Sequence, residues 1–228
     1  METGIVSTGR SVAHTKITYM VKTDSLRFHY TQEQPAFNFP NIALAAQEDL
    51  LILGQSGIGK TTLLHLLAGL LKPTGGHVYI NEVAINSLST AKLDLYRGQN
   101  IGLVFQKNHA IRSLSVFENV QARLFFGKKE IHTTAIDELL NELGLGKLKK
   151  RKLQELSEGQ LQRLGIALSV IHKPKLILAD EPTSSLDDEN CAIVIGLLKK
   201  QAQKNNANLI VITHDHRIKP FFQNSITL

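Results

Sequence analysis

The 228-residue sequence has a single cysteine, Cys191, and no long hydrophobic run. One cysteine excludes a disulfide within the chain, so a reducing compartment is the simplest environment for this protein. The longest apolar stretch, TTLLHLLAGLL, has about 11 residues, whereas a membrane-spanning helix needs about 20. Residues 1–20 also lack the apolar centre of a secretory leader. These absences predict a soluble or peripheral membrane protein.

No helix-turn-helix, zinc-finger or RNA-binding sheet motif accompanies the net charge of +6. The basic residues concentrate at one place, because five of the six residues from Lys147 to Lys152 are Lys or Arg. Such a run is most often a solvated turn. An anionic membrane surface or an acidic partner is the next interpretation, and DNA is the last. We therefore expect no nucleic-acid partner.

Internal repeats and low-complexity linkers are absent as well, and the length suits one domain. Strand-like apolar segments lie at 25–30, 49–54, 77–81, 101–106, 175–182 and 208–215. Helical patterns occur in three places: after the segment at 49–54, over roughly 115–150, and from Ser157 towards Pro174. Strands that alternate with helices predict an α/β fold with a mostly parallel sheet. The helical block at about 107–165 interrupts the alternation and is expected to form an inserted lobe.

The segment GQSGIGKT fits the pattern G-x-x-x-x-G-K-[ST] and lies between a predicted strand and a predicted helix. Its glycines let backbone N–H groups surround a phosphate chain at the positive end of the helix dipole. The lysine is expected to reach the β- and γ-phosphates, and the threonine after it to bind Mg²⁺. The predicted nucleotide-binding residues are Gly54, Gln55, Ser56, Gly57, Ile58, Gly59, Lys60, Thr61 and Thr62.

Two acids, Asp180 and Glu181, end the buried strand-like segment LILADE. Alone they would most often be solvated strand-end acids, but beside a phosphate loop they suggest chemistry. Asp180 is placed to hold Mg²⁺ together with Thr61. Glu181 is placed to orient or deprotonate the attacking water, which is typically worth about 10²- to 10⁴-fold in rate.

Polar residues also end two other strand-like segments, and ligands of open α/β sheets bind at these ends. His214 follows VIT and is expected to contact the γ-phosphate or the water. A metal site formed by His214 and His216 is a weak alternative, since no third ligand has a matching spacing. Gln106 ends IGLVFQ. Two interpretations of Gln106 stay open, a ligand of Mg²⁺ or water and a strand-end glutamine without a role.

The turn LSEGQ precedes a further helix. Ser157 is a suitable N-cap, and Gly159 leaves the backbone open to close approach. The chain therefore contains a second anion-binding helix N-terminus. The phosphate loop already binds one nucleotide, so a second anion-binding site is useful if it closes over the nucleotide of another copy. Two copies related by a twofold axis would then bury two nucleotides.

Over roughly residues 21–228 the chain resembles the ATPase domain of ABC (ATP-binding cassette) transporters. The resemblance rests on the order of GQSGIGKT, Gln106, LSEGQ, LILADE, SSLD and His214. The resemblance implies a P-loop NTPase core, a small antiparallel β-subdomain and a helical lobe. It also implies MgATP as ligand and head-to-tail closure of a homodimer. The signature residues Ser157, Glu158, Gly159 and Gln160 would then meet the γ-phosphate of the second copy.

Two further roles are implied by this resemblance. Asp187, in SSLD, would lie at the dimer seam and couple the two sites. Tyr30 resembles the aromatic that stacks on adenine, although packing within its strand is an equal alternative. The sequence also departs from the family. Glu158 replaces the usual first glycine of the signature, and residues 1–20 precede the usual start, so either Met20 is the initiator or the segment is an extension.

Within this family, the chain most resembles the lipoprotein-releasing, macrolide-export and cell-division branch. The segments that carry this resemblance are LLHLLAGLLKPTGGHVYIN, FENV and LADEPTSSLD. The implied function is ATP hydrolysis that drives a separate membrane permease, with the ATPase in the cytoplasm at the inner face of the membrane. One alternative is a regulatory or mechanotransmitting ATPase without a transported substrate. A DNA-repair or ribosome-acting ABC protein is less favoured, since the chain has neither a coiled-coil insertion nor a second cassette.

Overall fold

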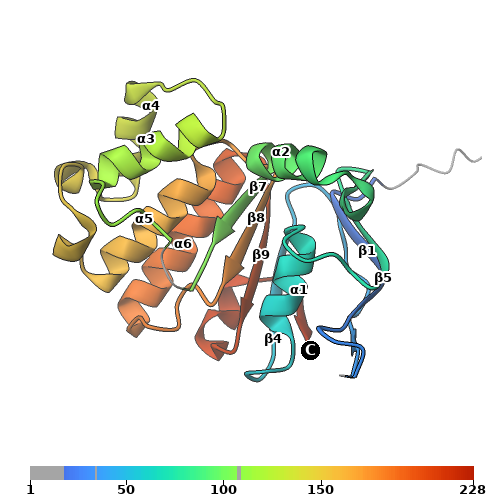
Figure 1. Ribbon diagram of the computed structural model, residues 1–228. Helices are drawn as coiled ribbons and strands as arrows, with labels where there is room; N and C mark the ends of the chain where they lie inside the picture. Colours follow the sequence, from blue (N-terminus) through green and yellow to red (C-terminus); the bar gives the residue numbers. More distant parts are fainter. Residues whose placement is uncertain (1–17, 34, 107–108) are drawn as a thin grey trace, which may run out of the picture.

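A computed structural model describes residues 18–33, 35–106 and 109–228. The predicted N-terminal extension, residues 1–20, lies almost wholly outside this part of the chain, as do the first two residues of the predicted helical lobe. The described residues form two sheets and six α-helices (Figure 1). Within them, no helix combines the length and the apolar character that crossing a membrane requires.

A five-stranded parallel sheet forms the centre of the molecule, in the order β10-β4-β9-β8-β7. Its strands are β10 (Ser225–Thr227), β4 (Asp49–Leu53), β9 (Asn208–Thr213), β8 (Leu176–Asp180) and β7 (Ile101–Val104). Every residue of β8 and β9 is buried, as expected for strands covered on both faces. The predicted α/β fold with a parallel sheet is confirmed.

The second sheet is antiparallel and has the order β2-β1-β5-β6, with β3 also paired to β1. Its strands are β1 (Val21–Phe28), β2 (Phe37–Asn38), β3 (Ala43–Leu44), β5 (Gly75–Ile80) and β6 (Val83–Ala84). The predicted strand at 25–30 was misplaced, because β1 begins at Val21 and ends before Tyr30. The register of β1 shifts between Asp24 and Arg27, where Ser25 has a φ of 47°.

The helices are α1 (Lys60–Leu67), α2 (Thr90–Asn100), α3 (Val116–Phe126), α4 (Thr133–Glu142), α5 (Glu158–Val170) and α6 (Asp188–Lys204). Short 3₁₀ turns lie in the connecting segments: η1 (Ile85–Ser87) before α2, η2 (Gly146–Leu148) and η3 (Leu153–Glu155) between α4 and α5, and η4 (His216–Phe221) between β9 and β10. The helices α3 and α4 lie at the end of the molecule away from β1 and β5 (Figure 1).

Two hydrophobic cores lie on opposite faces of the parallel sheet, and neighbouring residues of each strand alternate between them. Ile177 and Ala179 belong to the core shared with α3, α4, α5 and α6. Leu176 and Leu178 belong to the core shared with α1 and the antiparallel sheet. The period of two follows from the pleat of a strand, so the sheet is the common wall of both cores. The carboxyl ends of its parallel strands meet at one edge, and the candidate site lies there.

Candidate functional site

The phosphate loop connects β4 to α1 and has the backbone that its glycines permit. Gly57 and Gly59 have φ values of 84° and 105°, in the left-handed region that favours glycine. A Cβ atom on Gly59 would lie 2.8 Å from Cδ1 of Phe37, so a side chain there would be both strained and crowded. Gly59 also precedes the first turn of α1, whose free N–H groups face the loop.

Lys60 is 6% exposed and turns back over this loop. Its ammonium donates to the carbonyl oxygens of Gly54 at 2.8 Å and Gln55 at 3.0 Å. It also lies 3.5 Å from Oε1 of Glu181. The three oxygens compensate a nearly buried charge, and they hold the ammonium where a polyphosphate could replace them as the partner.

Thr61 and Asp180 join the start of α1 to the end of β8. The hydroxyl of Thr61 donates to Oδ2 of Asp180 at 3.0 Å. Burial raises the pKa of Asp180, and the bond from Thr61 opposes that effect. Oδ1 of Asp180 is buried and has no hydrogen-bond partner in the described structure. A buried carboxylate oxygen beside a threonine hydroxyl is a donor set that suits Mg²⁺, so these residues fit the ion.

Glu181 follows β8 with a φ of 47°, an uncommon conformation for a residue with a side chain. Oε2 accepts from the hydroxyl of Thr213 at 2.6 Å and from the backbone N–H of His214 at 3.3 Å, and Oε1 lies 3.0 Å from Nδ1 of His214. Burial raises the pKa of Glu181, but the bonds from His214 and Thr213 outweigh it, so the pKa lies below its ordinary value. The carboxylate is therefore anionic at neutral pH.

The ring of His214 borders a cavity that the phosphate loop and Glu181 also line, and 54% of the His214 side chain is exposed. This cavity, of about 360 Å³, is here called the P-loop cavity. Its lining residues come from the antiparallel sheet, the phosphate loop, the start of α1 and the segments after β7, β8 and β9: Tyr30, Phe37, Ser56, Gly57, Gly59, Lys60, Thr61, Thr62, Gln106, Glu181 and His214. Gly54, Gln55 and Ile58 instead line an adjacent cavity of about 520 Å³, which His214 also borders.

Tyr30 has contacts that fit both of its predicted roles. Its hydroxyl bonds to the hydroxyl of Thr62 at 2.8 Å, and its ring packs edge-on against Phe28 at 4.8 Å between centroids. The ring is nevertheless 56% exposed and borders the P-loop cavity. Sequence reasoning missed Phe37, which lines the cavity beside Tyr30 and stacks on Phe39. The alternation of phenylalanines in FNF was the available signal.

Gln106 lies two residues beyond the end of β7, so it does not close that strand as predicted. Its side chain is exposed and donates to the hydroxyl of Ser184 at 3.4 Å. It borders the P-loop cavity and a second, larger cavity of about 660 Å³ that Glu158 and Ser184 also line. Gln106 therefore lies between the phosphate loop and the turn before α5.

The turn LSEGQ is built as an N-terminal cap. The hydroxyl of Ser157 accepts from the N–H of Gln160 at 3.3 Å, and Oε1 of Gln160 accepts from the N–H of Ser157 at 3.0 Å. Glu158 is exposed in the first turn of α5, and a Cβ on Gly159 would lie 3.2 Å from Oδ1 of Asn190. None of these four signature residues lines the P-loop cavity of the same chain.

Asp187 caps α6 and is exposed. Its carboxylate accepts from the backbone N–H of Asn190 at 2.8 Å and from the side-chain amide of Asn190 at 2.9 and 3.0 Å. These bonds hold the pKa of Asp187 below its usual value. The Asn190 side chain thus lies between Asp187 and Gly159, so it links the turns before α5 and α6.

A network that the sequence did not reveal joins the end of β9 to the turn before α6. Oδ2 of Asp215 accepts from the hydroxyl of Thr183 at 2.9 Å, and Arg217 donates to both Asp215 oxygens at 2.8 and 2.9 Å. Arg217 also donates to Oδ1 of Asp188 at 2.6 Å and to the carbonyl of Leu186 at 3.2 Å. Thr183, Leu186 and Asp188 lie about 30 residues before Asp215 and Arg217 in the sequence, so no local pattern indicates these contacts.

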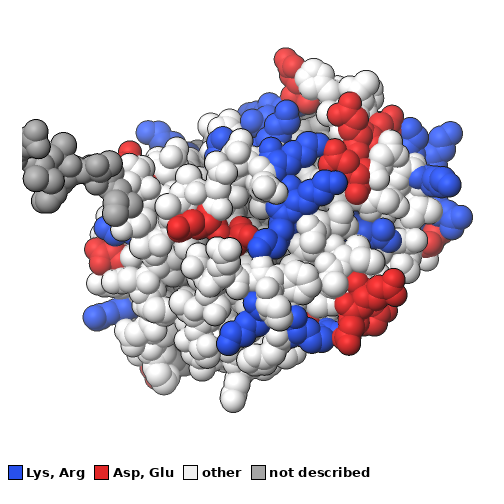
Figure 2. Space-filling model, turned by 180° about the vertical axis from the view of Figure 1, so that it is seen from behind, with Lys and Arg blue, Asp and Glu red and all other residues white. Residues whose placement is uncertain are grey.

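The basic run at 147–152 is partly neutralised. Lys149 pairs with Asp137 at 2.8 Å, and Lys152 lies 3.5 Å from Glu118. Seen from behind, Lys and Arg side chains form small groups with Asp or Glu beside most of them (Figure 2). The pairs at 147–152 are consistent with a solvated turn.

A model of the family described as ABC transporter matches residues 37–184 of this chain. The lipoprotein-releasing system ATP-binding protein LolD of Xanthomonas axonopodis pv. citri is 33% identical over 205 residues, which cover 88% of this chain and 84% of that protein. LolD of Hydrogenovibrio crunogenus is 40% identical over 187 residues, which cover 81% of each chain.

A solved structure, described as a dimeric post-hydrolysis state of the ATP-binding cassette MJ0796 bound to ADP and Pi, has the same fold with a TM-score of 0.81. It is 32% identical in sequence, and the match covers 92% of this chain and 94% of that one.

Proposed function

This chain belongs to the ABC transporter family, and on that premise we propose that it is an ATP-binding and ATP-hydrolysing subunit that drives a separate membrane permease. The observation that carries the proposal is the meeting of Lys60, Thr61, Glu181 and His214 around the P-loop cavity, with Asp180 bonded to Thr61. Each of these groups has a role in phosphoryl transfer that its contacts support.

Substrate binding falls to the phosphate loop. Free N–H groups at the start of α1 and the ammonium of Lys60 are donors for the phosphates of ATP. Tyr30 and Phe37 border the same cavity and offer aromatic faces to the base. Thr61 and Asp180 would hold Mg²⁺, which would neutralise charge on the β- and γ-phosphates when bound.

Glu181 is the proposed base for the attacking water. Its carboxylate is anionic at neutral pH, and donors from Thr213 and His214 fix its direction. His214, held by Glu181 through Nδ1, is proposed to contact the γ-phosphate. Gln106 is proposed to bind Mg²⁺ or the attacking water, since its side chain borders both the P-loop cavity and the cavity that Glu158 lines.

A second copy is proposed to complete each site. The signature residues Ser157 to Gln160 do not line the P-loop cavity of their own chain, while they form an exposed helix N-terminus that suits an anion. Head-to-tail closure on MgATP would place this turn against the nucleotide of the other copy, with Asp187 at the seam. The relatives described as dimeric cassettes support this arrangement.

The permease and its cargo are inferred from the relatives. The two relatives described above, at 33% and 40% identity, are named lipoprotein-releasing system ATP-binding proteins, which supports export or release of a lipoprotein or lipid. We propose a location at the cytoplasmic face of the membrane for the same reason. A regulatory ATPase that transmits closure without moving a substrate remains the alternative, and a transport assay separates the two.

ATP hydrolysis by the purified chain tests the proposal. Lys60→Ala removes a nearly buried charge-assisted contact worth about 1.5–3 kcal/mol, so phosphate release should be abolished and ATP binding weakened. Lys150→Ala, at an exposed lysine of the turn before η3, is the matched control and should hydrolyse ATP normally. A Lys60→Ala protein with the parental rate would contradict the assignment of the phosphate loop.

A further inference from the structure

Helix α3 ends in two adjacent phenylalanines that project from the molecule, here called the phenylalanine pair. Phe125 is 66% exposed and Phe126 is 72% exposed, and their rings pack edge-on with centroids 5.6 Å apart. Single exposed apolar side chains are common in soluble proteins. Two neighbouring aromatic rings that both stay this exposed form an apolar patch, which is a feature of interaction surfaces.

Two lysines follow the phenylalanine pair, and the end of the helix holds them beside it. The N–H of Lys128 donates to the carbonyl oxygen of Phe125 at 3.1 Å, and the N–H of Lys129 donates to that of Leu124 at 3.0 Å. Leu124 is buried, so this turn is anchored to the core. Both lysine side chains are exposed, and among the described residues no carboxylate forms an ion pair with either ammonium.

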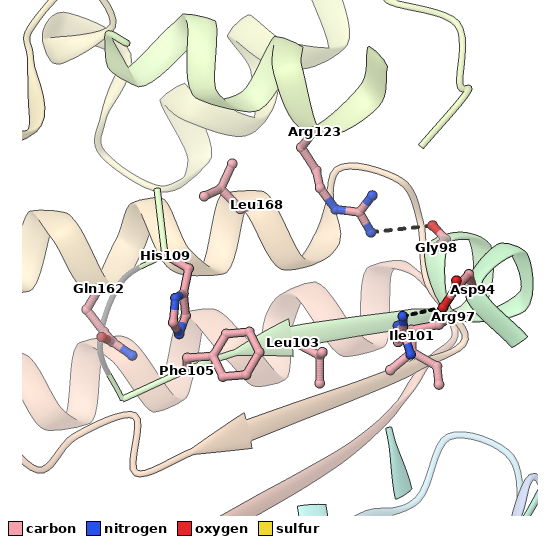
Figure 3. A pocket seen from close by; sticks show the side chains of 11 residues that line it. Asp94, Arg97, Gly98, Ile101, Leu103, Phe105, His109, Arg123, Gln162 and Leu168 are labelled. Atoms are coloured by element: carbon pink, nitrogen blue, oxygen red, sulfur yellow. Dashed lines mark hydrogen bonds and ion pairs between the residues drawn. The ribbon is translucent and has the colours of Figure 1, made fainter. Parts of the chain in front are cut away.

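The turn after α3 lies on the outside of the molecule. In Figure 1 the connection between α3 and α4 is at the top of the view, whereas the phosphate loop between β4 and α1 is at the bottom. Arg123, one turn earlier on α3, points instead into the cavity between α2, β7, α3 and α5, towards Gly98 (Figure 3). The turn therefore displays the charges of the two lysines and of Glu130, which lies 3.0 Å from Nε2 of His132.

Aromatic side chains next to lysines are typical of segments that lie in a membrane interface. The rings enter the boundary between headgroups and acyl chains, and the lysines extend their apolar stems so that the ammonium groups reach anionic headgroups. Neither ring of the phenylalanine pair lines the cavity into which Arg123 points. A projecting pair fits a deformable bilayer, whereas a protein partner would need a pocket of matching shape.

We propose that the turn after α3 contacts a bilayer that contains anionic lipids, with the phenylalanine pair inserted and Lys128 and Lys129 at the headgroups. A half-buried phenyl ring strengthens partitioning by about tenfold. A lysine near an anionic surface strengthens it by about fivefold, and Glu130 offsets one of the two lysines. The proposal shares only the location at a membrane with the proposed function.

This contact orients the protein at the membrane and does not anchor it. Two rings and one net charge together strengthen partitioning by about 500-fold. A single myristoyl chain, which gives only marginal and reversible binding, has a partition constant of about 10⁴ M⁻¹. The turn after α3 is therefore a weak, reversible contact that acts together with a second attachment.

Sedimentation with large unilamellar vesicles tests the contact in the absence of nucleotide. The parent should bind vesicles of about 70% phosphatidylcholine and about 30% phosphatidylglycerol at least about fivefold more tightly than vesicles of phosphatidylcholine alone. The double variant Phe125→Ser and Phe126→Ser should bind at least about tenfold more weakly. Ile193→Ser, at an exposed isoleucine of α6, is the control and should bind as the parent does. Equal binding of the parent to both kinds of vesicle, or binding to neither, would overturn the proposal.

A pair of charge variants tests whether the two lysines direct the contact. The double variant Lys128→Gln and Lys129→Gln should bind the anionic vesicles at least about fivefold more weakly. The double variant Lys150→Gln and Arg151→Gln removes the same charge from the basic run at 147–152, and its binding should stay within about twofold of the parent. Equal losses in the two double variants would show that the overall charge of the molecule attracts it to vesicles, which would contradict the assigned turn.

Fluorescence tests the insertion itself. The chain has no tryptophan, so Phe126→Trp introduces a single probe at the end of α3. Its emission should shift to the blue on anionic vesicles and be quenched by brominated lipids, whereas the emission of an Ile193→Trp variant should not change. Without a blue shift at position 126, a protein partner rather than lipid would have to cover the phenylalanine pair, and the proposal would be wrong.

The outcomes separate this proposal from the proposed function. The double variant Phe125→Ser and Phe126→Ser should hydrolyse ATP at the parental rate, since neither ring lines the P-loop cavity. Failure of the vesicle tests with normal hydrolysis rejects only the membrane contact. Selective binding to anionic vesicles by a parent that does not hydrolyse ATP rejects only the ATPase.

Discussion

At the scale of single residues, Glu181 combines a strained backbone with a side chain fixed by several donors. Its left-handed conformation costs about 1–2 kcal/mol for a residue with a Cβ. Thr213, His214 and Lys60 all direct hydrogens or charge at its carboxylate. Strain that the surroundings hold in place is characteristic of functional sites. The contacts thus set both the position and the charge of the proposed base.

Thr213→Val is a nearly isosteric change that removes one of these donors. Glu181 is active as the anion, so hydrolysis is lost as the pH falls through its pKa. The bond from Thr213 lowers that pKa, and the variant should therefore lose activity at a higher pH than the parent. The measurement is kcat across pH 4–8. An unchanged acidic limb would mean that Glu181 does not control the rate there.

Glu158 is a residue whose effect depends on where its side chain points. It lies in the first turn of α5, where an acid gains roughly 0.3–1 kcal/mol from the helix dipole. Its side chain is exposed and borders the large cavity that Arg112 also lines. An outward position keeps the carboxylate away from a phosphate bound at Ser157 and Gly159.

Glu158→Gly should therefore change ATP-driven closure by less than about tenfold, or about 1.4 kcal/mol. Dimerisation in a Glu181→Gln background, at low and moderate salt, measures the effect. A gain of a hundredfold on removing the acid would show that the carboxylate faces the phosphate.

At the scale of elements, Arg217 of η4 fastens the end of β9 to the turn before α6. It donates to Asp215, to Asp188 and to the carbonyl oxygen of Leu186. The bond from its side chain to Asp215 is the chief cause that lowers the pKa of Asp215 to about 2. A depressed carboxyl pKa contributes stability at neutral pH, and that contribution is lost as the pH falls from about 4 towards about 2.

Arg217→Gln should lower the urea concentration at the midpoint of unfolding at pH 7 by a modest amount, since the guanidinium is partly exposed and its ion pairs are screened by solvent. The loss should shrink below pH 3, where the parent also loses the pair. Turnover should fall several-fold with little change in KM for ATP, because His214 precedes Asp215. Urea titrations at both pH values and steady-state kinetics check this, and a pH-independent loss would contradict the assigned pair.

The elements that sequence analysis found are those with strong apolar patterns. The predicted fold class is confirmed, and β4, β8 and β9 lie where their apolar runs predict. Analysis of the sequence did not identify α2, because none of its residues is buried and only Leu93 and Tyr96 pack against the core. It also missed β10, a three-residue edge strand held by pairing with β4. In α6 the Asp187 cap was available as a signal but was not used.

In the candidate site, too, the sequence predicted the parts that have a strong local pattern and missed those that depend on the fold. The spacing of Gly54 to Thr61 predicted a phosphate loop, and parallel strands predicted that Asp180, Glu181 and His214 would share one edge. The contacts themselves could not be predicted, because they depend on rotamers and long-range packing. Arg217 lies in a turn whose local pattern does not indicate its contacts with Asp188 and Leu186, so these two neighbours are visible only in the fold.

At the scale of the whole molecule, the separation of signature and phosphate loop within one chain predicts a dimer. Glu181→Gln should bind MgATP but hydrolyse it very slowly, which would hold two copies closed. The variant should elute as a dimer at saturating MgATP, whereas the parent should be mainly monomeric. The double variant Lys60→Ala and Glu181→Gln is the control and should stay monomeric. A monomeric Glu181→Gln protein that binds MgATP would count against head-to-tail closure.

The alternation of β8 and β9 between two cores has a consequence for the cooperativity of unfolding. Loss of the helices on one face would expose Ile177 and Ala179, while Leu176 and Leu178 of the same strand still packed on the other face. The backbone hydrogen bonds of a strand are kept or lost for the strand as a whole, whichever face has lost its packing. Neither core is therefore a separate unit of stability. The helical end and the antiparallel sheet, although far apart, should therefore melt together in a single transition.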